Sequence, residues 1–298
     1  QRYPLKKLNA AAYQYTFQNV HQDFEYYVGN DQHGSKALRT EILERPAIGS
    51  FQIVLDYPAY TGKRSDTLAP NIGDFTAIYG TQAAWVFNFR GPVKAAKFKT
   101  KGQDKINVNQ SEDGTVGLFT QTVKDPASYS IQLVSDAGIR NVDTVRYNIK
   151  VEEDKYPSIS LKAPGYQTML PNSGIVPLEA DVSDDFGFAR AELHYRYLKS
   201  GSAGKVSKQY QTQRLRLDAD GNFGRIEQPV DFIELGAEQG DELEFFVRIY
   251  DNDPFNGPKF ADSGPRKISY TSLKDQYDEM ENVGDELAAE LQELMKET

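Results

Sequence analysis

Most of the chain between residues 13 and 270 consists of short runs in which large apolar residues occupy every second position. Phe51, Ile53 and Leu55 show this spacing, and the run 85–89 repeats it. A period of two puts such side chains on one face of a β-strand. Gly, Pro, Asn and Asp separate the runs, and no useful helical period occurs before residue 272. The pattern predicts an all-β body built from sandwiches.

Three segments of the chain share one design, namely DFEYYVGND at 23–31, SYSIQLVSD at 128–136 and ELEFFVRIYDND at 242–253. Each is an alternating strand that ends in Asp, followed by a Gly-containing loop and one last strand. Pro-marked restarts follow the first two segments, near residues 46 and 157. These repeats predict tandem immunoglobulin-like β-sandwiches. The expected units are a truncated partial module at 1–45, full sandwiches at 46–153 and 154–271, and a separate tail at 272–298.

The segment DPASYSI at 125–131 resembles the tyrosine corner of immunoglobulin-like domains, in which a Tyr precedes a Cys by two residues. Ile131 takes the place of that Cys, as a chain without Cys requires. We therefore expect Asp125 and Tyr129 to have structural roles, with the Tyr129 hydroxyl bonded to backbone at the corner of its strand. The alternative is an ordinary strand in which the Tyr is incidental.

The tail repeats apolar residues at the heptad spacing of a coiled coil. Leucine or methionine recurs every seven residues, and a further leucine is offset by four, which gives the seam Leu273, Met280, Leu287, Leu291 and Leu294. This spacing predicts a C-terminal α-helix that begins a coiled coil and associates with a second copy. A helix that docks on its own domain fits the pattern equally well.

Composition and charge exclude several kinds of site and partner. The chain has no Cys, which excludes disulfides, thiol catalysis and Cys-based zinc sites. Residues 273–298 hold nine acidic and two basic residues, a net of −7, so only −2 of the total −9 falls on the rest. The acidic balance argues against nucleic acid as a partner. No stretch is apolar enough to span a membrane, and the start at Gln1 suggests a piece of a longer protein.

Several short motifs resemble catalytic or phosphate-binding sequences but lack the residues that these chemistries need. Asp185-Phe186-Gly187 matches a kinase tripeptide, yet the Gly-rich loop, the strand lysine and the His-Arg-Asp loop are missing. SGSAGK at 200–205 follows Lys199 where a phosphate loop needs Gly, and DADGN at 218–222 lacks the later calcium-loop positions. The three histidines have no spacing suited to a triad or a metal pair. We predict neither a catalytic site nor a cofactor site, and no enzyme activity.

Two motifs resemble a family of large membrane-anchored envelope proteins of Gram-negative bacteria whose function is not established. They are YP-x-YTG at 57–62, within the longer match 55–87, and DDFG-x-A-x-AEL at 184–193. Family members have N-terminal membrane helices, periplasmic immunoglobulin-like repeats and a long, helical, Gln-rich C-terminal region. The resemblance implies a periplasmic location and a membrane anchor in the full-length protein, but it implies no activity.

Together these patterns favour a non-catalytic interaction or spacer module with protein partners. Tandem sandwiches form a rod that can hold a binding end at a fixed distance from an anchor. The alternative is a carbohydrate- or peptidoglycan-binding module, which exposed Tyr and Trp side chains clustered on one sheet face would favour.

One end of the last sandwich is rich in carboxylates. On our strand assignment the loops after its second and sixth strands meet where the chain enters, and they bring together Asp154, Asp184, Asp185, Asp251 and Asp253. Such charges repel unless they are neutralised, and calcium stiffens tandem sandwiches of the cadherin type in this way. The alternative is that these residues only make turns and point into water, and the lack of a complete ligand motif favours it.

Overall fold

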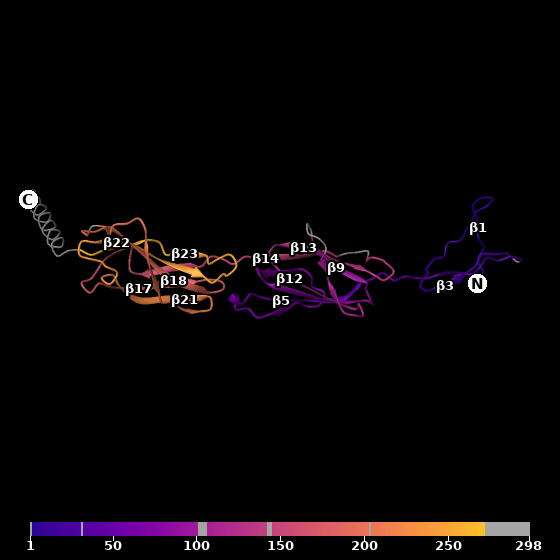
Figure 1. Ribbon diagram of the computed structural model, residues 1–298, viewed down its shortest axis with the longest axis horizontal. Coiled ribbons are helices and arrows are strands. Elements are labelled where there is room, and N and C mark those ends of the chain that lie inside the picture. Colours follow the sequence, from indigo (N-terminus) through magenta and orange to yellow (C-terminus); the bar gives the residue numbers. More distant parts are fainter. Residues whose placement is uncertain (1, 31, 101–105, 142–144, 203, 272–298) are drawn as a thin grey trace, which may run out of the picture.

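The computed structural model describes residues 2–30, 32–100, 106–141, 145–202 and 204–271. Two β-sandwiches lie end to end, and two small hairpins precede them (Figure 1). The described residues contain no α-helix, and their one helical turn is the 3-10 turn η1, Ala59–Thr61. No helix in the described part of the chain is long and apolar enough to cross a membrane. The expected tail helix and its heptad seam lie outside the described residues.

The first full sandwich, called module two here, consists of two five-stranded sheets. Their strand orders are β11-β12-β8-β5-β6 and β10-β9-β13-β14-β7. The bounds are β5 Ile48–Asp56, β6 Asp66–Thr67, β7 Phe75–Ile78, β8 Gln82–Phe89, β9 Ala95–Thr100, β10 Ile106–Asn107, β11 Asn109–Gln110, β12 Val116–Thr122, β13 Ala127–Val134 and β14 Tyr147–Glu152.

The second sandwich, module three, has the strand orders β15-β17-β21-β20 and β16-β24-β22-β18-β19, with β23 paired to β22. The bounds are β15 Ser158–Ala163, β16 Gln167–Met169, β17 Ile175–Ser183, β18 Phe188–Lys199, β19 Gln211–Leu215, β20 Asp218–Asp220, β21 Phe223–Asp231, β22 Glu242–Asp251, β23 Phe260–Asp262 and β24 Arg266–Ser269.

The two sandwiches share one topology. In each, the first strand pairs in one sheet, and the chain then crosses to the other sheet and forms a short strand parallel to the last one. These parallel pairs are β7 with β14 and β16 with β24. This crossing is a feature of immunoglobulin-like sandwiches. The predicted all-β class is therefore confirmed, and the repeats detected in the sequence correspond to equivalent strands, β13 and β22.

The cores differ in composition although the topology is shared. Module two packs aromatic rings around Trp85, which is fully buried and lies 5.0 Å from the Phe98 ring and 5.5 Å from the Tyr129 ring. Module three is filled mainly by aliphatic side chains such as Leu193 and Val247, with fewer aromatic rings among them. Ile131 is buried in the core of module two, at the position predicted to replace a Cys.

Tyr129 bonds to backbone, but not at the corner of its own strand. Its hydroxyl donates to the Gly73 carbonyl at 2.8 Å and accepts from the Trp85 indole N–H at 3.0 Å. Gly73 precedes β7, so the bond ties the crossing segment to the core. Burial raises the pKa of the Tyr129 phenol. Asp125 is exposed in the turn before β13, so the structure gives it no buried structural contact.

Residues 2–30 and 32–45 form two separate hairpins instead of a sandwich. The strands are β1 Lys6–Lys7 with β2 Tyr13–Gln14, and β3 Phe24–Tyr26 with β4 Leu38–Thr40. The rings of Phe17 and Phe24 lie 4.7 Å apart, but the buried hydrophobic clusters of the described residues belong to modules two and three. The antiparallel pair β3–β4 lies in the segment predicted to hold the closing strands of a truncated module, and the truncation itself stays a prediction.

Candidate functional site at the junction of the sandwiches

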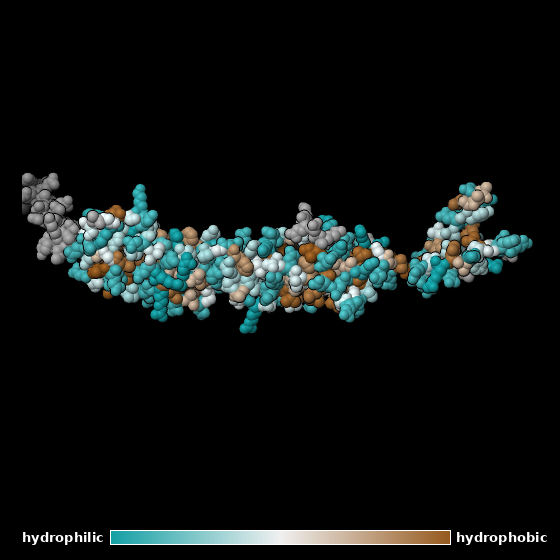
Figure 2. All heavy atoms as spheres, viewed as in Figure 1, coloured by the Kyte–Doolittle hydropathy of each residue, from teal (hydrophilic) through white to brown (hydrophobic). Residues whose placement is uncertain are grey.

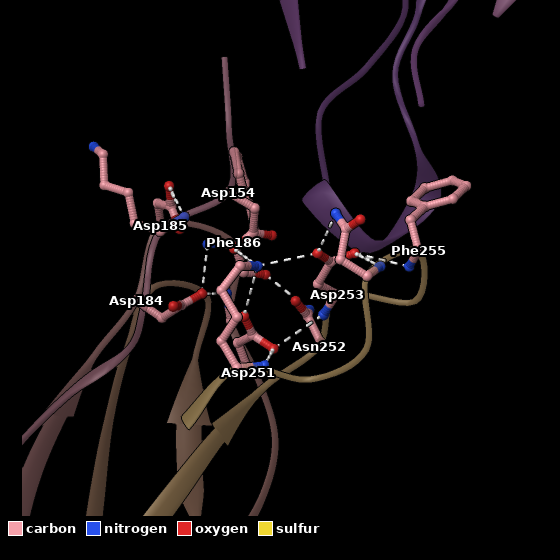
Figure 3. A network of polar contacts seen from close by, with 12 residues as sticks. Asp154, Asp184, Asp185, Phe186, Asp251, Asn252, Asp253 and Phe255 are labelled. Atoms are coloured by element: carbon pink, nitrogen blue, oxygen red, sulfur yellow. Dashed lines mark hydrogen bonds and ion pairs between the residues drawn. The ribbon is translucent and has the colours of Figure 1, made fainter. Parts of the chain in front are cut away.

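Three segments of module three meet where the chain leaves module two. They are the linker at 153–157, the loop 184–187 after β17 and the loop 252–259 after β22. Figure 3 shows Asp154, Asp251 and Asp253 together with Phe186 and Phe255 at this junction. The sandwich topology places both loops at this end, because β17 and β22 both run toward it. The structure thus brings together the carboxylates that were singled out in the sequence.

Lys259 lies among three of these carboxylates. Its ammonium group is 3.0 Å from Asp154 Oδ1, 3.2 Å from Asp251 Oδ2 and 3.0 Å from Asp253 Oδ2. The side chains of the three acids are almost inaccessible, with exposed fractions of 3%, 0% and 1% in the same order. Burial opposes a charge on the lysine, but hydrogen bonds to the carboxylates outweigh burial and raise the pKa of Lys259. Lys259 is therefore the counter-ion of the site.

The pKa values of Asp154 and Asp253 shift in opposite directions, although both carboxylates bind Lys259. Burial raises the pKa of Asp154, against the opposing effect of Lys259. Burial also acts on Asp253, but there the backbone N–H of Phe255 and the Lys259 ammonium prevail and lower the pKa. Three carboxylates share one ammonium, so the network depends on Lys259 for its neutralisation.

The Asp184-Asp185-Phe186-Gly187 segment is a turn. Asp184 Oδ2 accepts the backbone N–H groups of Phe186 and Gly187, each at 2.9 Å. Gly187 has a φ of 104°, a conformation that L side chains rarely adopt. Burial raises the pKa of Asp184, and Asp185 Oδ2 accepts the backbone N–H of Lys155 at 3.4 Å. The kinase-like tripeptide therefore presents Phe186 at the junction and ties its loop to the linker.

This arrangement differs from the calcium site hypothesised from the sequence. The described residues contain no group of three or more His, Cys, Asp or Glu side chains arranged to hold a metal ion. A lysine ammonium lies among three of the five predicted ligands, and the other two accept backbone N–H groups. The carboxylates do not point into water either, because Asp154, Asp251 and Asp253 are buried. Sequence reasoning missed Lys259, which reaches Asp251 from the returning arm of the same loop.

The motif YPAYTG supplies the other half of the junction. It forms η1 in the long segment between β5 and β7 of module two, and its Tyr60 ring reaches module three. That ring lies 5.8 Å from the Phe186 ring at 82° and 6.2 Å from the Phe255 ring at 66°. Edge-to-face geometry of this kind is favourable between aromatic rings. The Asn252 side-chain amide also donates to the Tyr60 carbonyl oxygen at 3.2 Å.

Further contacts extend the junction on both sides of Tyr60. Tyr79 lies 5.8 Å from the Phe255 ring, and the Lys63 ammonium lies 5.7 Å from the Phe186 ring centre. Gly80 has a φ of +89°, and a Cβ added there would lie 2.7 Å from the Phe255 ring. A larger residue at position 80 would therefore clash with that ring. Burial, followed by the charge of Asp154, raises the pKa of the Tyr60 phenol. The aromatic contact and the buried charge network are therefore one continuous structure.

An open groove of about 510 Å³ lies at the opposite end of module two. It is lined by Arg45, Pro46, Ala47, Ile48, Gly49, Phe51, Asn71, Ile131, Asn141, Val145 and Tyr147. The lining includes no pair of titratable side chains suited to acid–base chemistry.

No protein-family model matches the chain, and no curated protein sequence matches it. Among solved structures, the fibronectin(III)-like modules of Clostridium thermocellum CbhA are 18% identical, with 68% of this chain and 92% of that chain covered and a TM-score of 0.25. A chimeric titin Z1Z2–Z1Z2 tandem is 15% identical over 67% and 95%, with a TM-score of 0.22. The adhesin InvE of Yersinia pseudotuberculosis is 12% identical over 67% and 57%, with a TM-score of 0.25. At these scores the likenesses carry no argument about binding or activity.

Proposed function

We propose that the chain is a non-catalytic interaction and spacer module in which the angle between two sandwiches is fixed. The observation that carries this proposal is the junction, where Tyr60 of module two lies against Phe186 and Phe255 of module three. Domains within one chain move relative to each other by default, unless a substantial interface restrains them. Here aromatic packing and a buried charge network act at the same place, so the restraint is specific.

The linker takes part in the same restraint. Asp154 belongs to the linker, and its ion pair with Lys259 joins it to the loop after β22. Rotation at the linker would pull Asp154 away from the ammonium and leave buried charges without a partner, which is costly. A rod made in this way transmits position and orientation from one end to the other.

The proposal includes the setting that the family resemblance implies, namely the periplasm and a larger membrane-anchored protein. The YP-x-YTG and DDFG motifs support it, because both carry the resemblance and both contribute residues to the junction. A rigid spacer is of use in such a protein, since it holds a binding surface at a set distance from the anchor. Fractionation of cells that express the tagged full-length protein tests the location.

The carbohydrate-binding alternative requires exposed aromatic rings with free faces. Trp85, the chain's only Trp, is fully buried in module two. On the outer face of the β22 sheet the rings are present, but the Arg190 guanidinium lies 3.7 Å from the Tyr250 ring centre and that of Arg248 lies 3.9 Å from the Phe260 ring centre. Guanidinium groups thus occupy positions that a sugar would need.

Spin-label distances test the fixed angle, because the Cys-free chain accepts labels at chosen positions. Lys150→Cys on β14 and Glu227→Cys on β21 place one label on each sandwich at exposed residues. We expect a narrow distance distribution that broadens when Tyr60→Ala is added. Tyr156→Ala in the linker, a highly exposed Tyr, is the control and should leave the width unchanged. A broad distribution in the protein with an intact junction would overturn the proposal.

A further inference from the structure

The outer face of one sheet of module two carries no charge across three rows of residues. The rows run across β5, β8 and β12, and in this order they are Ser50, Asn88 and Val116, then Gln52, Val86 and Leu118, then Val54, Ala84 and Thr120. We call these nine residues the uncharged face. Leu118 is 45% exposed and Val116 37%. Figure 2 shows apolar side chains gathered over this region of β5 and β12.

Module three provides an internal comparison, because its β17 and β21 occupy the equivalent places in the same topology. The outer face there carries charge in the middle rows. Asp181 lies opposite Arg225, with 3.2 Å between Oδ1 and Nε, and Glu179 lies opposite Glu227. Lys162 adds a further cation 3.7 Å from Asp181. A solvated face of this sandwich is thus charged, and the uncharged face departs from that pattern.

The outer faces of the other two sheets are charged as well. In module two, β9 and β14 present Lys97, Lys99 and Lys150. In module three, the β18–β22 sheet presents ion pairs such as Arg196 with Glu244, 2.6 Å apart. Of the four outer sheet faces of the two sandwiches, the uncharged face is therefore the one suited to contact without charge partners.

The uncharged face has features that favour a partner packed on top of it. Asn88 Nδ2 donates to Ser50 Oγ at 3.2 Å, so these two side chains already share one hydrogen bond within the face. The strands at the edges of the sheet, β6 and β11, are two residues each and offer little backbone for another strand. A partner would therefore pack on the face and not add to the edge.

We propose that the occupant of the uncharged face is the same face of a second copy of this chain. Charge decides between the occupants that the chain itself offers, since any other sheet face would bury charged groups against uncharged ones. Contact between identical patches closes as a dimer and does not propagate. Overall charge permits this contact, because only −2 of the net charge lies outside residues 273–298.

The size of the face sets the expected strength of the dimer. Three strands about 4.8 Å apart, with rows about 7 Å apart along them, cover a few hundred Å². Stable interfaces bury roughly 800 Å² per partner, so this contact is weak by itself. A second contact, or confinement to a membrane surface, would raise the effective concentration and strengthen it. This inference rests on the proposed function, to which it adds a partner, but its test is separate because spin-label distances within one chain do not depend on it.

Disulfide trapping suits a weak contact in a chain without Cys. Leu118→Cys places one thiol on the uncharged face, and Glu227→Cys places one on the equivalent sheet of module three as the control. Both variants should also carry Leu287→Asp, which removes the predicted tail seam as a route to association. We expect Leu118→Cys to form the covalent dimer at least about tenfold faster than Glu227→Cys under mild oxidation. Equal rates would overturn the proposal.

A second measurement uses charge in place of a thiol. In the Leu287→Asp background we expect sedimentation to show a concentration-dependent dimer, which Val86→Lys should abolish and Thr76→Lys, at the one exposed residue of β7, should not. Both side chains point outward, and unchanged thermal unfolding would show that module two still folds. Pelleting with phosphatidylcholine–phosphatidylglycerol vesicles that depends on Val86, without a dimer in solution, would assign the face to lipid and overturn the proposal.

Discussion

Modules two and three have one topology but use its crossing segment differently. In module two the chain between the first strand and the strand parallel to the last one runs from residue 57 to 74 and contains η1, whereas in module three it is confined to 164–166. The long version reaches the neighbouring sandwich through Tyr60. In module three this segment only connects the two sheets. In module two the equivalent segment also forms half of the junction, although the strands on either side of it are equivalent in the two modules.

The other half of the joint shows the same division between scaffold and loop. In module three the loops after β17 and β22 carry Asp184 and Lys259, with their buried partners, and Phe186 and Phe255. The junction therefore depends on loops from both modules, and each module has its own determinants of stability. Substitutions can therefore be chosen to weaken one module and spare the other.

The largest expected effect comes from Lys259→Met. It removes the ammonium and leaves Asp154, Asp251 and Asp253 buried without a counter-ion. Breaking a buried ion pair from one side costs about 3–5 kcal/mol. Urea unfolding should show this loss in the transition of module three, with module two unchanged.

The matched control for that substitution is Lys267→Met on β24. Its ammonium lies 3.3 Å from Glu242, but the lysine side chain is 45% exposed. An exposed pair of this kind contributes at most about 1 kcal/mol. Equal losses in the two variants would mean that the carboxylates at the junction are solvated, contrary to the structure.

Tyr129→Phe acts on module two instead. It removes the hydroxyl that binds the Gly73 carbonyl and the Trp85 indole, and leaves two buried groups unpaired. The expected loss is about 1–3 kcal/mol, with the fold retained and module three unaffected. Tyr147→Phe, a half-buried tyrosine of the same core, is the control and should cost less. No change in the unfolding midpoint of Tyr129→Phe would contradict the assigned hydrogen bonds.

A smaller, pH-dependent effect is expected at Asp184. Burial raises the pKa of its carboxyl in the folded state, so its contribution to stability is fully present below the unfolded value near 3.8 and is lost as the pH rises through the raised value. Asp184→Asn keeps an oxygen for the N–H groups of Phe186 and Gly187 but cannot ionise. The variant should therefore gain stability relative to the parent as the pH rises from 3 to 7, by less than Lys259→Met loses. A constant difference across this range would refute the buried assignment.

Much of the fold, and part of the site, could be predicted from the sequence. Alternation at 51–55 predicts the buried face of β5 because a period of two needs no knowledge of neighbours. The clustering of Asp154, Asp251 and Asp253 follows from the known meeting of loops in this sandwich. The positions of Lys259 and Tyr60 could not be derived, since each depends on how a loop folds back toward another module. The partner of Tyr129 was missed for the same reason, because Gly73 is distant in sequence.

The smallest expected effect is that of calcium on the unmutated protein. Calcium takes six to eight oxygen ligands, and to use Asp154, Asp251 and Asp253 it would have to displace an ammonium that lies within 3.2 Å of all three. A ligand that binds only the folded state must raise the unfolding midpoint. We therefore expect thermal unfolding with millimolar calcium and with a chelator to give the same midpoint. In Lys259→Met the three carboxylates no longer have the lysine, so calcium should raise the midpoint of that variant more than that of the parent. A calcium-dependent rise in the parent as large as in the variant would mean that Lys259 leaves the site, and that a metal cation and not the lysine neutralises the three carboxylates.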